Sequence, residues 1–162
     1  MDSGMWLILL IVGVIAMIFG PIMMLQPNSS QRRQEKLRSH ALTTGFRVAM
    51  RPLSKAVKGL EVGTMIPVYT FLQQRDAEKF GGWFLQRSDY AHESHLLDYW
   101  EWQDRIKAGA EDLQWLTRIL PEVPGSVVAI AASAQGIHWY WMESGGEDTL
   151  AKLKALSQGL PS

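Results

Sequence analysis

Residues 5–25, MWLILLIVGVIAMIFGPIMML, decide the architecture of this chain, because none of these 21 positions carries a charge. The apolar core of a bilayer is ~30 Å thick, and about 20 apolar residues in a helix can cross it. A cleavable signal peptide would have a shorter apolar run, a basic segment before it and small residues at its cleavage site. Here Asp2 is the only charge before a long run, and no Ala-x-Ala follows. We therefore expect an uncleaved transmembrane helix.

Positive charges follow the apolar run and do not precede it. The nearest ones are Arg32, Arg33, Lys36 and Arg38. Lys and Arg close to a membrane span favour the cytoplasmic side. We expect a single-pass protein of the bacterial inner membrane, with residues 1–4 in the periplasm. Residues 26–45 then form a basic juxtamembrane helix or linker, and residues 46–162 form a cytoplasmic domain.

The charge of the chain is strongly asymmetric although its total is zero. Residues 26–60 have a net charge of +7, and residues 61–162 have a net charge of −6. Anionic headgroups attract a juxtamembrane Lys or Arg by ~1 kcal/mol each. We therefore expect Arg32, Arg33, Lys36 and Arg38 to bind lipid headgroups. The acidic remainder argues against a nucleic-acid partner.

Three small residues share one face of the apolar helix, since Gly13, Ala16 and Gly20 follow at spacings of three and four. Small residues on one face allow a second transmembrane helix to approach closely. This pattern points to a membrane-protein partner. The alternative is that Gly and Ala simply occur often in membrane helices.

The rest of the chain alternates between strand-like and helix-like patterns. Strand-like patterns favour strands at 46–51, 65–72, 83–87, 127–132 and 137–143; the segment 127–132 is a run of small apolar residues that we expect to be buried on both faces. Helical spacing favours helices at 30–44, 104–120 and 147–158. We predict an α+β fold in the order α-β-β-β-α-β-β-α, with an antiparallel or mixed sheet of about five strands and two to three helices. The third strand is expected to pair with the second. Residues 135–136 are expected to form a hairpin turn.

Tryptophan is concentrated in the domain, where six of the seven lie between residues 83 and 141. Large aromatic side chains favour the core of a small sheet domain. The alternative is an exposed docking surface, since aromatic residues are enriched at binding hot spots. Its candidate residues are Trp100, Trp102, Trp139 and Trp141.

One cluster resembles a metal site, because His92, His95 and Asp98 would share a face if they were helical. The spacing differs from the HExxH motif of zinc hydrolases, and a polar surface loop is the favoured interpretation. The chain also has no cysteine, no Gly-x-Ser-x-Gly motif and no glycine-rich phosphate loop. We expect a non-enzymatic protein without a cofactor.

The N-terminal part combines an apolar helix ending in residues 24–27, MLQP, with the polar segment 31–36, QRRQEK. This arrangement resembles YajC, the small accessory protein of the bacterial Sec translocase, over about 35 residues, although the domain here is longer. The whole chain resembles single-pass inner-membrane proteins of proteobacteria. The small-residue face of the apolar helix, the basic segment after it and the lack of catalytic motifs favour an accessory or scaffold protein that binds a larger membrane complex. The alternative is a membrane-tethered sensor that binds a ligand or metal.

Overall fold

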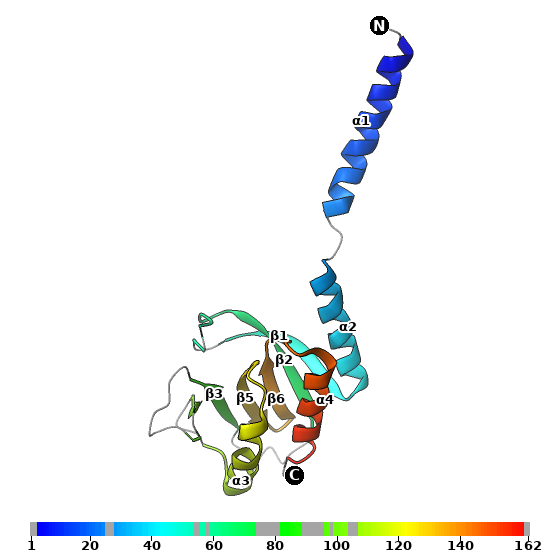
Figure 1. The fold of residues 1–162 in the computed structure, drawn as a ribbon. Helices are drawn as coiled ribbons and strands as arrows, with labels where there is room; N and C mark the ends of the chain where they lie inside the picture. The colour runs from blue at the N-terminus through cyan, green and yellow to red at the C-terminus, as the bar shows by residue number, and fades with distance from the viewer. Residues whose placement is uncertain are drawn as a thin grey trace. The chain divides into compact units, whose positions relative to one another are not determined.

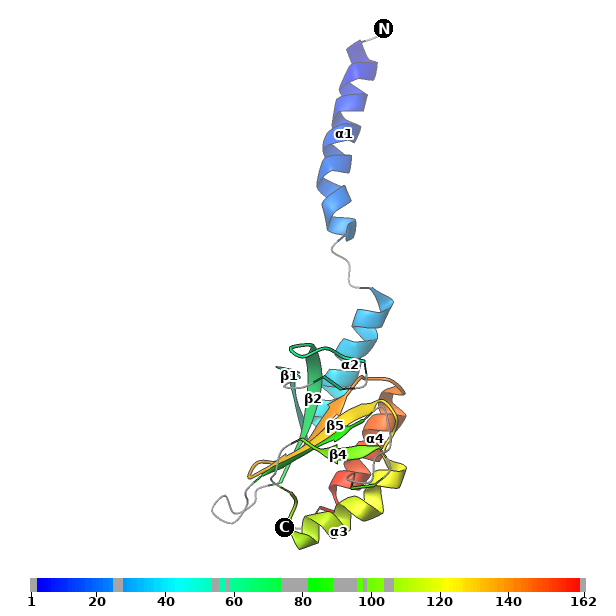
Figure 2. The ribbon, with the colours of Figure 1, turned by 90° about the vertical axis from the view of Figure 1, so that its left-hand side faces the viewer.

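The structure is a computed structural model, which describes residues 3–24, 28–53, 56–57, 59–73, 82–88, 96–97, 99–103 and 107–160. The chain forms two compact units, Met1–Glu35 and Lys36–Ser162. Four α-helices and six strands lie within the described residues; Figure 1 labels them except for β4, which Figure 2 labels. The α+β class is confirmed.

The first unit contains helix α1, Ser3–Met24, and the start of helix α2, Ser29–Thr43. The large apolar side chains of α1 are exposed from Met5 to Phe19. Within the part of the chain that the structure describes, no helix is long and apolar enough to qualify as a membrane span. The transmembrane part of the fold prediction is thus not supported by the structure and stays a prediction.

The second unit is built on one antiparallel sheet of six strands in the order β1-β2-β6-β5-β3-β4. The strands are β1 Phe46–Pro52, β2 Met65–Leu72, β3 Trp83–Arg87, β4 Trp100–Trp102, β5 Val127–Ser133 and β6 Gly136–Trp141. Five of them lie where the sequence predicts strands. The predicted hairpin between β5 and β6 is confirmed, but its turn lies at residues 134–135, and Gly136 already belongs to β6.

One prediction about the sheet is wrong. Strand β3 pairs with β5 and β4, not with β2. The sheet has six strands where about five were predicted, the additional one being the three-residue strand β4. Alternation identifies a strand but carries little information about its partner, which depends on how the apolar faces pack.

The larger core lies between the sheet and the helices α3, Ala110–Ile119, and α4, Gly146–Ser157. Figure 2 shows both helices on the same side of the sheet. Helix α2 adds Leu37 and Ala41 to this core, as its apolar side predicts. Helix α3 contributes Trp115, Leu116 and Ile119 to this core, whereas its Leu113 is exposed.

The other face of the sheet has a smaller core. Its buried members are Leu53, Val57, Ile66, Val68 and Val128. Leu53 and Val57 belong to the connection between β1 and β2, which therefore packs against this face. The connection is held by backbone hydrogen bonds from Leu53 to Thr64 (2.9 Å) and from Gly63 to Leu53 (2.8 Å).

Candidate functional site

The most distinctive polar cluster joins helix α2 to the end of the sheet. The guanidinium of Arg38 donates from Nε to Glu143 Oε1 (2.6 Å) and from Nη2 to Glu143 Oε2 (2.9 Å). The hydroxyl of Tyr69 donates to the same Oε1 at 2.8 Å. The Glu143 carboxylate thus accepts three hydrogen bonds, two of them from a bidentate, charge-assisted pair.

Burial makes this cluster energetically important. The side chain of Glu143 is only 2% exposed, whereas that of Arg38 is 36% exposed. A buried carboxylate is costly unless it is paired and hydrogen-bonded. The bond to Glu143 raises the pKa of Arg38. Burial first, and then the bond to Glu143, raises the pKa of Tyr69, so this hydroxyl stays protonated and acts as a donor at neutral pH.

The backbone at Glu143 is also unusual. Its φ of 56° is the one positive value at a residue other than glycine within the described part of the chain. For an L-residue the left-handed region costs roughly 1–2 kcal/mol. The three hydrogen bonds to the side chain compensate for this strain, and they hold residue 143 where α2 passes.

This pairing distinguishes Arg38 from the other three residues of the expected lipid contact, which stays a prediction. Arg38 is committed to Glu143 and does not project as a free cation, whereas Arg32, Arg33 and Lys36 are exposed on α2. The physical reason is the helical period. At about 100° per residue, Arg38 lies next to Ala41 on the buried side of α2, roughly 200° from Lys36. A helical wheel places Arg38 on a different side of α2 from Arg32, Arg33 and Lys36. The sequence does not, however, predict that its partner is Glu143, 105 positions away.

Burial counts against the docking alternative at Trp100, Trp139 and Trp141, whereas Trp102 stays a prediction. Trp139 and Trp141 are fully buried, Trp100 is 3% exposed and Trp102 is half-buried. Two of the indole N–H groups find partners inside the domain, since Trp139 donates to Ser157 Oγ (2.8 Å) and Trp141 to Ser126 Oγ (3.0 Å). The side of β6 that carries both rings is covered by α3 and α4, so the rings form core.

The suggested metal ligands lie outside the described residues, so His92, His95 and Asp98 stay a prediction. Among the residues that are described, no group of three or more potential metal-ligating side chains comes together. The small face of α1 also remains a prediction. Space around Gly13 is open, since a Cβ there would meet nothing within 4 Å, while the surroundings of Gly20 are outside the description.

A second polar network lies on the sheet face opposite α3 and α4, and sequence reasoning missed it. His138 on β6 bonds through Nδ1 to Thr70 Oγ1 and through Nε2 to Ser133 Oγ, both at 2.8 Å. The Ser–His pair has the separation of a nucleophile and its base. However, a neutral threonine occupies the place of an orienting carboxylate. Burial, helped by the charge of Arg51, lowers the pKa of His138 to about 4, which makes it a weak base. We interpret the network as structural.

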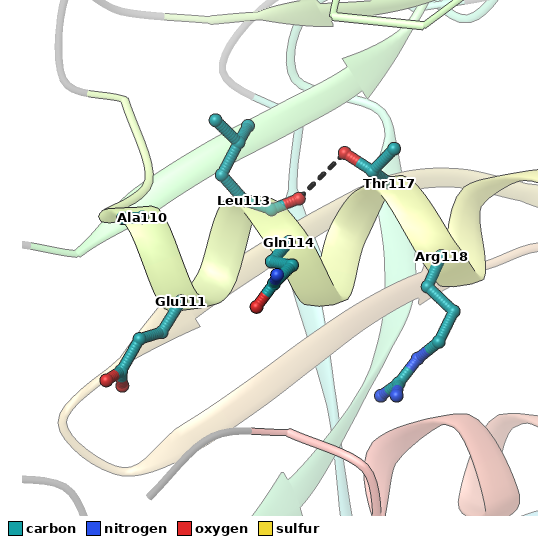
Figure 3. A pocket seen from close by; sticks show the side chains of 6 residues that line it. All are labelled: Ala110, Glu111, Leu113, Gln114, Thr117 and Arg118. Atoms are coloured by element: carbon teal, nitrogen blue, oxygen red, sulfur yellow. Dashed lines mark hydrogen bonds between the residues drawn. The ribbon is translucent and has the colours of Figure 1, made fainter.

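A surface hollow of about 580 Å³ lies along α3. Figure 3 shows its lining, which comes entirely from that helix: Ala110, Glu111, Leu113, Gln114, Thr117 and Arg118. The hydroxyl of Thr117 is already bonded to the Leu113 carbonyl at 2.8 Å. Since all six residues lie on one open helix face, the hollow does not enclose a reacting group.

Comparison with known proteins gives no relative from which a role could be carried over. No protein family matches the chain, and neither curated proteins nor solved structures include one that is significantly similar to it.

Proposed function

We propose that the chain is a membrane-anchored accessory or scaffold protein without catalytic activity. Helix α1 lies in the bilayer, and the α+β domain positions a larger membrane complex. The observation that carries this proposal is the exposure of α1. Its thirteen large apolar side chains between Met5 and Phe19 are 48–81% exposed, all the way round the helix.

A helix that is apolar on every side has to be covered by lipid or by protein. Covering a large apolar side chain is worth roughly 1.5–3 kcal/mol, so leaving thirteen of them in water costs on the order of 20 kcal/mol or more. The side chains described in α1, residues 4–19, span about 24 Å at 1.5 Å per residue, and the apolar sequence continues to residue 25. With that continuation the length suits a ~30 Å bilayer core.

The domain supports a role in holding rather than in catalysis. The polar clusters at Glu143 and His138 are hydrogen-bonded internally: Glu143 binds Arg38 and Tyr69, and His138 binds Thr70 and Ser133. The hollow on α3 is open. The bidentate bond from Arg38 also fixes the second half of α2 to the domain. A membrane anchor can set the position of a domain only if the helix between them is held by that domain.

The proposal is tested by crosslinking the full chain in native membranes, extracting it gently and purifying it. We expect a stoichiometric membrane-protein partner. In a Gly13→Leu/Ala16→Leu variant the recovered partner should fall by roughly tenfold, because bulk on this face blocks close helix contact. Ile11→Leu, on the opposite side of α1, is the matched control and should keep the partner. A monodisperse monomer without any partner would contradict the proposal.

A further inference from the structure

Exposed apolar side chains are concentrated at one end of the domain. Eight large ones are exposed in the described part after residue 36: Leu42, Met50, Val62, Met65, Leu72, Tyr99, Leu113 and Met142. Five of these eight lie at the end of the sheet where β1 ends and β2 begins. We call this end, with Met50, Val62, Met65, Tyr99 and Met142, the hairpin end.

The strand register places these residues together. Pro52 pairs with Met65, so Met50 and Met65 lie at the last pairs of the β1–β2 hairpin. Val68 pairs with Tyr140, which brings the residue after β6, Met142, to the same end. Trp100 pairs with Arg87 at the end of β3, so Tyr99 is there as well. The exposed fractions are 66% for Val62 and 54% for Met65.

The chain enters the domain at this same end. Helix α2 ends at Thr43, and β1 starts at Phe46, at the opposite end of the sheet. Going back along α2, Arg38 reaches Glu143, which follows β6 at the hairpin end. Lys36, the first residue of the second unit, therefore lies toward the hairpin end.

The two sides of the sheet differ in charge at the hairpin end. The sequence from residue 51 to residue 61 has a net charge of +2; of its charged residues the structure describes Arg51 and Glu61. Arg51 is exposed. The first turn of α4, on the other side of the sheet, carries Glu147 and Asp148. An anionic surface would thus attract the β1–β2 edge and repel the α4 edge.

We propose that the hairpin end is a second membrane contact, which enters the headgroup region of an anionic bilayer at Val62 and Met65. This inference rests on the proposed anchoring by α1. Apolar side chains flanked by cations are the combination that binds such an interface, with burial to a depth of ~5–10 Å. The contact would fix the tilt of the domain and turn its α4 edge away from lipid.

The absence of cysteine makes a direct test simple. The full chain is prepared with a single cysteine, Val62→Cys or Met65→Cys, labelled with an environment-sensitive fluorophore and reconstituted into vesicles. The vesicles contain phosphatidylcholine with or without phosphatidylglycerol, and spin-labelled lipid acts as quencher. Gln114→Cys is the control. It is exposed on α3, near Asp112, which binds Trp83 at the far end of the sheet at 2.6 Å.

In anionic vesicles we expect lipid quenching of both hairpin labels to be about threefold that of the Gln114 label. Arg51→Gln or high salt should reduce the difference, because both weaken the attraction to headgroups. Equal quenching at the hairpin and control positions, in chains that still float with the vesicles, would overturn the lipid contact and leave the anchor intact. Quenching that appears only after a membrane protein is added would overturn it in favour of a protein partner. Chains that fail to float would instead refute the anchor.

Discussion

The bond between Arg38 and Glu143 should be a main determinant of how firmly α2 is held by the domain. Arg38→Met keeps much of the side-chain volume but removes two charge-assisted hydrogen bonds. It leaves a carboxylate that is 2% exposed with the Tyr69 hydroxyl as its described partner. Breaking a buried pair costs ~3–5 kcal/mol. Since Arg38 is 36% exposed, we place the loss at the low end, about 3 kcal/mol.

A double-mutant cycle separates the pair energy from other effects. Glu143→Gln alone should cost about 2 kcal/mol, and the double variant Arg38→Met/Glu143→Gln should cost clearly less than the sum, with a coupling of about 2 kcal/mol. The assay is urea unfolding of the full chain in mild detergent, followed by the fluorescence of the buried tryptophans. Arg33→Met, an exposed cation on the same helix, is the matched control and should stay within about 0.5 kcal/mol of the native chain. Full additivity, or an Arg38→Met variant as stable as the control, would refute the role of the pair.

Two further results are expected from the interior of the domain. The pKa of His138 is about 4 in the folded state and about 6.5 in the unfolded state. Between these pH values the unfolded state therefore binds more protons than the folded state. The free energy of unfolding should fall by about 2 kcal/mol as the pH drops from 6.5 to 4. In urea unfolding at both pH values His138→Gln should lose most of this slope, and an unchanged slope would count against the buried neutral histidine. Gly136→Ala should destabilise by about 3 kcal/mol, since Gly136 has φ +133° and an added Cβ would overlap the Phe71 carbonyl oxygen. Gly63→Ala, with φ +85° and open space, isolates the backbone cost of about 1 kcal/mol, and equal losses for the two would contradict the steric explanation.

Local patterns in the sequence predict much of this fold. The pattern of apolar residues locates β1, β2, β3, β5 and β6: alternation indicates a strand with one buried face, and the continuous apolar run of β5 indicates a strand buried on both faces. The spacing of Leu37 and Ala41 correctly identifies the buried side of α2. The strand that pairs with β3 could not be predicted from such local patterns. Strand β4 could not be identified either, because its three residues, WEW, are too few to show a period.

The candidate site was harder to predict from the sequence than the fold, because its residues are far apart in the chain. Glu143 meets Arg38 across 105 positions, and His138 meets Thr70 across 68. Composition counts Arg38 as one more positive charge, whereas packing gives it a buried partner. Likewise, an aromatic strand can form core or a docking surface, and only the placement of α3 and α4 over Trp139 and Trp141 decides between the two.

The central claim is that α1 anchors the domain in a bilayer, and alkaline carbonate extraction of membranes from cells producing the full chain tests it most directly. Integral proteins resist carbonate, whereas proteins bound only by surface contacts are released. We predict that the native chain stays in the membrane pellet, and that Ile11→Asp/Ile15→Asp moves it to the supernatant, because each charge at the centre of a span costs ~2.5–3.5 kcal/mol. Ile11→Val/Ile15→Val is the matched control and should stay in the pellet. Release of the native chain by carbonate would contradict the claim.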